Sequence, residues 1–423
     1  MGESRRPPGR QTVVMVTTSY PRFPGDTIGT FMEPIARGVA ARGHEVHVVL
    51  PWHPRLARGP VEHGIRFHPF RYAPLAGLNV FGYAGALRAD VRLRLSAYAV
   101  APLALVAGWR KARSVARTYG ATVIHGHWVV PSGAIAAAAC PHLPLVVSLH
   151  GSDVYVAERS PIARRVAGAV LRRSGFVTAS SDDLRTRAIS LGAAPERSET
   201  VPYGVDTDRF HPDSAARARR RAELGLTDAA PLLFTAGRFV RKKGFEYLID
   251  AAARLSSGWP ALRLVIGGGG DLDRDLRERA ARQGIAEHVV FPGVLGHDEV
   301  AEYLAAADLI IVPSVRDDSG NVDGLPNVVM EALASGTALV TTAAGGIGAV
   351  AHDNRNAALV AERDVEGLAS RISELLRSPE TRARLGEQAR KDVIANHGWP
   401  RAAEAFERAY WRAGMHVGHP AGT

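Results

Sequence analysis

At 423 residues, the chain is too long for one ordinary hydrophobic core and long enough for two domains. Its 46% hydrophobic and 22% charged residues are typical of a globular protein. The single cysteine, Cys140, excludes an intramolecular disulfide and favours a reducing, cytoplasmic compartment. Residues 1–11 are polar and lack the apolar core of a signal peptide, so none is expected.

The net charge of +10 points to anionic partners. Only 7% of the residues are aromatic, and no zinc-finger spacing or RNA-recognition motif occurs, so a nucleic-acid partner is not expected. Phosphorylated substrates or an anionic membrane surface are the expected partners. The alternative is a basic surface without functional meaning.

Alternating apolar runs and helical patterns in the N-terminal half predict a parallel α/β sheet. A glycine-bearing loop at residues 25–30 follows the first strand, and such a loop can approach a phosphate closely. A plain strand-to-helix turn is the alternative. Strands are expected at residues 12–19, 45–50, 121–127, 145–150 and 176–180, and a helix at 32–41.

Residues 84–119 form a strongly basic segment with one acid, Asp90. Its charge-free centre, residues 97–109, is shorter than the roughly 20 residues that span a bilayer. The segment is either amphipathic and bound to an anionic leaflet, or a helix pair with its apolar side chains in the core. We favour the core interpretation. The basic residues are Arg88, Arg92, Arg94, Arg110, Lys111, Arg113 and Arg117, and the apolar ones are Leu103, Leu105 and Val106.

Two of the expected strands end in histidine. His125 and His127 have a metal-like spacing, but no third ligand follows nearby, so we expect no metal site. His150 and Asp153 lie in a glycine-containing loop at the carboxyl end of a strand, where α/β proteins bind ligands. The alternative is a buried, hydrogen-bonded His150 and a capping Asp153.

The strand and helix pattern restarts after a linker at residues 201–212. We therefore predict an N-terminal domain (1–204), a C-terminal domain (205–395) and a terminal helix (396–423) that returns to the first domain. In the second domain, strands are expected at residues 232–236, 262–266, 309–312 and 339–342, and helices at 245–255, 327–334, 365–376 and 380–395.

Arg238 and Lys243 follow a predicted strand, where two fixed cations can neutralise a diphosphate. A solvated basic loop is the alternative. Residues 267–270 are all glycine and are expected to form a turn. They lack the Gly-x-Gly-x-x-Gly spacing, so a dehydrogenase is not favoured.

Two carboxylates, Asp323 and Glu331, bracket the start of the helix at 327–334. Pro326 is expected in its first turn and Gly336 at its end. A helix start beyond a strand binds anions through free amides and the helix dipole. One carboxylate could then hold a sugar and the other a ribose. Alternatively, Asp323 caps the helix and Glu331 lies on a solvated face.

The run Asp-Gly-Leu-Pro, four residues and Glu-Ala resembles the Glu-x7-Glu motif of the GT4 glycosyltransferases. The resemblance covers nearly the whole chain and includes the spacing Gly-Arg-x4-Lys-Gly. It implies an α/β GT-B fold of two Rossmann-like, doubly wound domains with a cleft between them. This chain departs from the family at Asp323, where relatives have Glu, and at Ala349, where relatives usually have Glu.

The resemblance implies retaining transfer of a sugar from a UDP- or GDP-sugar to a glycan or polyprenyl-linked acceptor, without a metal or other cofactor. The basic segment near Trp109 suggests a polyprenyl-diphosphate-linked glycan as the acceptor, so we expect a cytoplasmic protein that is peripheral at the inner face of the membrane. The catalytic residues that the resemblance implies are His150, Asp323, Arg238 and Lys243. Its implied acceptor-binding residues are Thr30 and Asp153. Its implied donor-binding residues are Gly29, Gly237, Arg238, Lys243, Gly268, Val294, Asp323, Gly324, Leu325, Pro326, Asn327, Val328 and Glu331.

A non-catalytic GT-B-like binding subunit of a glycan-synthesis complex is the competing interpretation. Asp323 and Ala349 would then be signs of lost activity. The presence of Arg238, Lys243 and Glu331 together argues against it.

Overall fold

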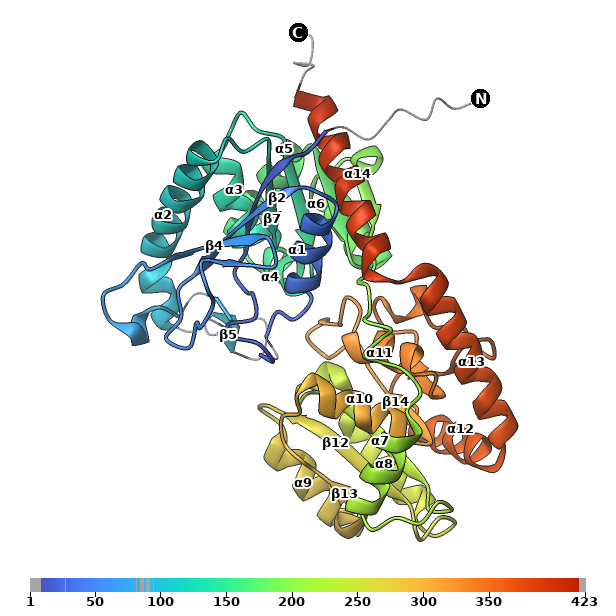
Figure 1. Ribbon diagram of the computed structural model, residues 1–423. Coiled ribbons are helices and arrows are strands. Elements are labelled where there is room, and N and C mark those ends of the chain that lie inside the picture. Colours follow the sequence, from blue (N-terminus) through green and yellow to red (C-terminus); the bar gives the residue numbers. More distant parts are fainter. Residues whose placement is uncertain are drawn as a thin grey trace. The chain divides into compact units, whose positions relative to one another are not determined.

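The computed structural model describes residues 9–26, 28–80, 82–83, 87–88, 92–93 and 95–417 (Figure 1). The chain forms two compact units. The first contains Met1–Pro202 and Trp399–Thr423, and the second contains Tyr203–Gly398. Each unit is described separately below.

The first unit is built on an eight-stranded sheet in the order β10-β9-β8-β7-β1-β2-β4-β3. Its strand pairs are parallel except β3 with β4. Because β1 has β2 on one side and β7 on the other, the strand order reverses there, and the carboxyl ends at such a point form ligand sites. The strands are β1 (Thr12–Val16), β2 (Glu45–Pro51), β3 (Val61–Glu62), β4 (Ile65–Phe70), β7 (Val123–His127), β8 (Leu145–Leu149), β9 (Phe176–Ala179) and β10 (Ser198–Thr200).

Helices cover both faces of this sheet. Alternate residues of the central strands pack with α1 and α14 in one continuous core. The terminal helix α14 also contacts β8 and β9 (Figure 1). The helices are α1 (Met32–Ala41), α2 (Leu95–Thr118), α3 (Ala134–Ala139), α4 (Ser152–Arg159), α5 (Pro161–Arg173), α6 (Asp182–Leu191) and α14 (Trp399–Val417); β5 (Leu87–Arg88) and β6 (Arg92–Leu93) form a short antiparallel pair.

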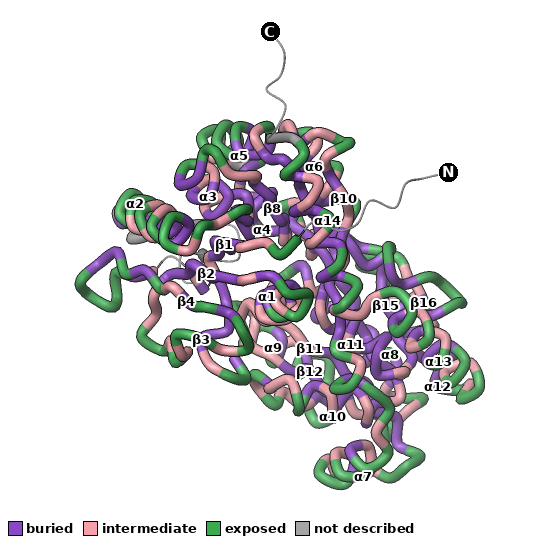
Figure 2. The backbone as a smooth tube through the Cα atoms, turned by 45° about the horizontal axis from the view of Figure 1, so that its top comes forward, coloured by how far each residue is buried: buried purple, intermediate pink, exposed green. Residues whose placement is uncertain are grey.

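The basic segment folds differently from our expectation. One helix, α2, takes the place of the expected helix pair. Leu103, Leu105 and Val106 are 54%, 41% and 47% exposed, so placing them in the core was wrong. Figure 2 shows exposed stretches of α2 in green. Helical periodicity identifies an apolar face but not what covers it. The side chains of residues 88–94 lie outside the described residues. No described helix is long and apolar enough to cross a membrane.

The second unit is built on a six-stranded parallel sheet in the order β13-β12-β11-β14-β15-β16. Helices α10, α11 and α13 contribute to the core on one face, and α8, α9 and α12 to the core on the other. The strands are β11 (Leu232–Arg238), β12 (Arg263–Gly269), β13 (Val289–Val290), β14 (Leu309–Val312), β15 (Leu339–Thr342) and β16 (Ala358–Val360). The helices are α7 (Ser214–Glu223), α8 (Phe245–Leu255), α9 (Asp273–Arg282), α10 (His297–Ala306), α11 (Asn327–Ser335), α12 (Val365–Arg377) and α13 (Pro379–Asn396).

The glycine run after the expected strand 262–266 is not a turn. Strand β12 continues to Gly269, and Gly237 and Arg238 of β11 pair with Gly268 and Gly269. A Cβ atom on Gly268 would lie 1.9 Å from the carbonyl oxygen of Gly237. Glycine therefore allows the two strands to stay paired up to the edge of the sheet.

Candidate nucleotide-sugar site

A short lysine-bearing turn follows β11. Residues Arg241–Lys243 form one 3₁₀ turn, and Gly244 (φ +66°) leads into α8. A Cβ atom on Gly244 would lie 2.0 Å from the carbonyl oxygen of Pro313, so this contact requires glycine. The amide of Val315 donates to the carbonyl of Lys242 at 2.9 Å. The turn is therefore held against the chain leaving β14.

This arrangement places Asp323 between two lysines. The ammonium of Lys242 lies 2.9 Å from Oδ1 of Asp323, and that of Lys243 lies 2.7 Å from Oδ2. Burial opposes ionisation of Asp323, but the charges and hydrogen bonds of Lys242 and Lys243 outweigh it and hold the pKa of that carboxyl well below its ordinary value. Asp323 is thus an anion at any physiological pH.

Asp323 does not cap α11. The N-cap is Pro326, and no side chain caps the helix, so placing Pro326 in the first turn was also wrong. An N-terminus without a side-chain cap is the arrangement in which helix amides bind anions. Gly345 (φ +60°) supports the loop before the helix, because its backbone approaches that of Asp323 closely. A Cβ atom there would lie 2.0 Å from the carbonyl oxygen of Asp323.

Glu331 lies one turn into α11 and is partly buried, which contradicts the solvated interpretation. Burial raises the pKa of its carboxyl to about 7, because it outweighs the opposing charges of Lys243 and Arg209. Glu331 therefore changes charge near neutral pH, whereas Asp323 does not.

The other expected donor residues of this unit lie around the same sheet edge. Gly237 borders the Lys243 side chain, because a Cβ atom there would lie 3.4 Å from Cε of Lys243. Arg238 is exposed at the last position of β11. Val294 is 69% exposed, and its Cγ2 would lie 3.5 Å from a Cβ atom on Gly269. Gly324, Leu325, Pro326 and Val328 are buried in the loop and first turn of α11, and Asn327 is partly buried.

His150 directly follows β8 in the first unit. Its Nε2 lies 3.1 Å from Nδ1 of His127, and its ring lies 4.7 Å from the rings of Phe31 and Trp128. Burial and the neighbouring His127 lower the pKa of His150 well below its ordinary value. The imidazole is therefore neutral at physiological pH.

Asp153, the expected acceptor residue of α4, is buried and turned toward the backbone. Oδ2 accepts from the amide of Val129 at 2.8 Å, and Oδ1 accepts from that of Gly151 at 3.1 Å. Burial raises the pKa of Asp153 despite these hydrogen bonds. These contacts give it a local structural role, and its acceptor-binding role stays a prediction.

The loop after β1 carries Gly29 and Thr30. Gly29 (φ +66°) lies against Ser19, where a Cβ atom would come within 2.7 Å of the serine hydroxyl. Arg22 and Asp26 form a buried bidentate pair of 2.6 and 2.8 Å at the start of the loop. Thr30 is partly buried just before α1.

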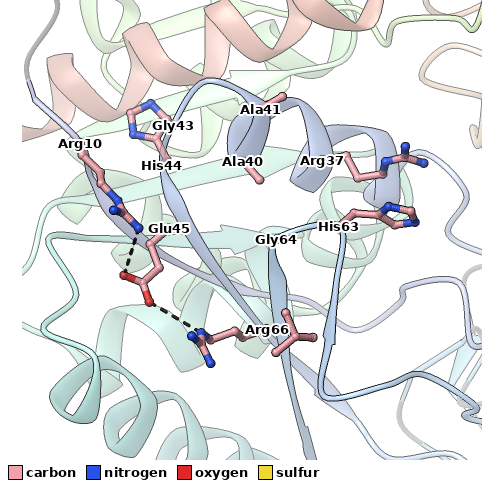
Figure 3. Close-up of a pocket in the computed structure, with 11 residues that line it drawn as sticks. Arg10, Arg37, Ala40, Ala41, Gly43, His44, Glu45, His63, Gly64 and Arg66 are labelled. Carbon is pink, nitrogen blue, oxygen red and sulfur yellow. Dashed lines mark ion pairs between the residues drawn. The ribbon is translucent and has the colours of Figure 1, made fainter.

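A basic hollow of about 640 Å³ lies at the amino ends of β1 and β2, the edge opposite His127 and His150 (Figure 3). Figure 3 shows Glu45 between Arg10 and Arg66, each 3.8 Å away. Because this carboxylate occupies the centre of the cations, the hollow is poorly suited to a phosphate. Across the described residues, no group of three or more His, Cys, Asp or Glu side chains could hold a metal ion.

The sequence did not indicate a role for Lys242. This lysine is buried, and it forms an ion pair with Asp323, as Lys243 does. Adjacent side chains point in different directions on a 3₁₀ turn, so local geometry does not indicate that both lysines reach one carboxylate. The buried contact of His125 was also missed, because it depends on Tyr410, 285 positions further along the chain.

Parallel doubly wound sheets place ligand sites at the carboxyl edge of their strands, and in the second unit that edge carries a lysine-bearing turn and the start of α11. Residues 28–209 match the family model Glycosyltransferase Family 4, and residues 216–392 match Glycosyl transferases group 1. The chain belongs to the GT4 family of glycosyltransferases and has the GT-B fold.

The relatives include the D-inositol 3-phosphate glycosyltransferase of Acidothermus cellulolyticus, which is 30% identical over 95% of this chain and 90% of its own. The GDP-mannose-dependent alpha-(1-6)-phosphatidylinositol monomannoside mannosyltransferase of Mycolicibacterium smegmatis is 34% identical over 60% of this chain and 66% of its own, just under two thirds. The sucrose-phosphate synthase of Thermosynechococcus elongatus has a similar fold, with a TM-score of 0.77 and 20% identity over 96% of this chain and 100% of its own. Anabaena HepE in complex with UDP has a TM-score of 0.73 and 19% identity over 94% of this chain and 98% of its own.

Proposed function

We propose that this protein transfers a sugar from a UDP- or GDP-sugar to a glycan or lipid-linked acceptor, with retention of configuration and without a metal ion. The observation that carries the proposal is the cluster of Lys242, Lys243 and Asp323 beside the uncapped start of α11. Arg238 ends β11 at the same edge of the sheet. Basic side chains and helix amides are the groups that bind a diphosphate in proteins.

The chemical role of this cluster follows from where charge develops. As the glycosidic bond breaks, negative charge grows on the departing nucleoside diphosphate. Lys243, Arg238 and the amides of α11 would stabilise that charge more than the ground state, which lowers the barrier. Fixed cations would thus supply the stabilisation that a metal ion gives in other enzymes.

The two carboxylates have different proposed roles. Asp323, held as an anion by its lysines, would orient hydroxyls of the donor sugar. Its side chain is one methylene shorter than the usual glutamate, and the lysine pair fixes its reach. Glu331 would bind the ribose, and a hydroxyl donor there favours its ionised form. In the first unit, neutral His150 would donate a hydrogen bond to the sugar or to the acceptor.

We also propose that α2 binds an anionic membrane surface, which suits a lipid-linked acceptor. Leu103, Leu105 and Val106 are exposed on α2, and Arg110 and Lys111 follow on the same helix. Both cations line a hollow of about 400 Å³ with Arg71. Exposed apolar side chains beside cations match a bilayer with anionic headgroups better than they match water.

The experiment that tests the function is a panel of donors and acceptors. Thermal shifts with UDP, GDP and their sugars identify the base, and transfer to lipid-linked saccharides and inositol-containing acceptors identifies the acceptor. The names of the relatives place GDP-mannose and inositol compounds in this panel. NMR of the product's anomeric proton then tests retention. Stabilisation by neither nucleotide diphosphate would contradict the proposal.

A further inference from the structure

A chain of polar groups runs through the core of the first unit and ends at His150. His125 and His127 lie on one face of β7, because alternate residues of a strand face the same way. Their ring centroids are 3.9 Å apart. The rings of His127 and His150 are stacked, with centroids 5.3 Å apart and planes 11° apart.

The inner end of this chain is fixed on both sides. The hydroxyl of Tyr410, on α14, lies 2.9 Å from Nδ1 of His125. Ser148 Oγ lies 2.7 Å from Nε2 of the same ring and 2.6 Å from Thr178 Oγ1. Both nitrogens of His125 are therefore engaged, and its ring is a rigid support for His127.

Only one of the two ring nitrogens of His127 has a hydrogen-bond partner among the described residues. Nδ1 lies 3.1 Å from Nε2 of His150, whereas Nε2 is buried without a hydrogen-bond partner among the described residues. Burial lowers the pKa of His127 to about 3, and His150 is neutral as well. Each ring thus carries one proton, and one N–H lies between them.

The unpaired Nε2 of His127 decides which ring donates. If His150 donated, His127 would carry its own proton on Nε2, as a buried N–H without an acceptor. If His127 donates from Nδ1, only a lone pair is left unpaired. In proteins, buried N–H groups without a partner are rarer than buried acceptors without one.

We infer that His127 is a positioning residue that donates its Nδ1–H to Nε2 of His150 and so fixes His150 as the Nδ1–H tautomer. The inference rests on the proposed function for its consequence. With Nε2 occupied and the proton on Nδ1, His150 is a neutral hydrogen-bond donor. It cannot take a proton from an acceptor hydroxyl, so that proton must leave to another group.

The tautomer is tested on the full chain labelled with ¹⁵N-histidine. Two-bond proton–nitrogen correlations distinguish the tautomers, and a His150→Asn variant assigns the resonances of His150. We expect an Nδ1–H ring in the wild type and a growing Nε2–H population in His127→Leu. An Nε2–H ring for His150 in the wild type would overturn the inference. This measurement needs no catalytic activity.

Kinetics test the consequence for transfer. An asparagine amide can replace Nδ1 of histidine as a donor, so His127→Asn should keep most of the activity. His127→Leu removes the donor, and we expect kcat to fall by about ten- to 10²-fold through misplacement of His150. KM for the donor should change by less than about threefold, because the proposed donor-binding cluster of Lys242, Lys243 and Asp323 belongs to the second unit.

The same sheet offers a matched control. His47 and His68 form a second histidine pair, with Nδ1 and Nε2 3.0 Å apart and ring centroids 5.2 Å apart. His68→Leu removes one partner of that pair and should leave kcat per folded molecule unchanged. Equal losses in His68→Leu and His127→Leu, or none in His127→Leu, would overturn the positioning role. A wild type without any transfer would instead contradict the proposed function, and the tautomer would still be decided by NMR.

Discussion

The ammonium of Lys243 lies 2.7 Å from Oδ2 of Asp323, and both side chains are almost completely buried, at 14% and 13% exposure. Lys242 binds the other carboxylate oxygen at 2.9 Å. Two cations therefore hold one carboxylate in the loop before α11. We propose that this position receives the diphosphate of the donor sugar.

Asp323→Asn should remove both stability and activity. The substitution removes the negative charge that the ammoniums of Lys242 and Lys243 share, and breaking such a pair costs about 3–5 kcal/mol. We expect a lower midpoint of urea unfolding and little sugar transfer. Asp323→Glu is the matched control, because it keeps the charge and should retain both lysine contacts. If Asn and Glu at this position behaved alike, the lysine–aspartate cluster would not have the role assigned to it.

Gly345→Ala should displace the Asp323 loop. The new methyl group would lie 2.0 Å from the carbonyl oxygen of Asp323, at a residue with φ +60°. Because both the clash and the backbone conformation oppose alanine, we expect a loss of about 1–3 kcal/mol in the free energy of unfolding, together with weaker donor binding. Gly348→Ala, where the nearest atoms are 3.7 Å away, should have little effect. Calorimetry and titration with UDP and GDP check both expectations.

Glu331→Gln should change how stability depends on pH. The folded-state pKa of Glu331 is raised to about 7, above its ordinary value of 4.5, so the folded protein holds this proton more tightly. The free energy of unfolding therefore falls as pH rises from about 4.5 to 7. Glutamine does not ionise, so the variant should not show this contribution to the fall. The midpoint of thermal unfolding of the variant, relative to wild type, should increase across this window and then level off. A constant difference across this window would contradict the burial of Glu331.

The α2 surface should bind vesicles through both its apolar and its basic side chains. We expect flotation with phosphatidylglycerol vesicles but not with phosphatidylcholine alone, and weaker binding at high salt. Leu103→Ser with Val106→Ser, or Arg110→Glu with Lys111→Glu, should each reduce it. Ile394→Ser, at a residue that is 56% exposed on α13, is the control. Flotation that ignores lipid charge would exclude the proposed surface.

Much of the fold could be predicted because local patterns and tertiary structure agree. Helices α1 and α8 and strands β14 and β15 have the bounds expected from the sequence. The prediction failed where a neighbouring element decides the outcome. The glycines of β12 stay extended because β11 pairs with them, against their turn preference.

The residues of the candidate site were visible as motifs, but their contacts were not. The spacing around Lys243 and Glu331 indicates a diphosphate and a ribose site by family resemblance alone. It does not reveal that Lys242 and Lys243 both contact Asp323, or that these lysines lower the pKa of Asp323 whereas burial raises that of Glu331. Those properties depend on the 3₁₀ turn and on packing across β11 and β14. Likewise, the sequence indicates the apolar face of α2. Its exposure depends on whether another element packs against that face.

The most direct test is transfer of a radiolabelled sugar from UDP- and GDP-sugars to a lipid-linked acceptor, in the presence of EDTA, by the wild type and by Lys243→Ala. We expect metal-free transfer by the wild type and a fall of at least about 10²-fold in kcat for Lys243→Ala, because the cation acts on the charge of the leaving diphosphate. Lys391→Ala, at a residue with 71% side-chain exposure, should match the wild type. Transfer that EDTA abolishes, or that survives Lys243→Ala unchanged, would contradict catalysis by fixed cations.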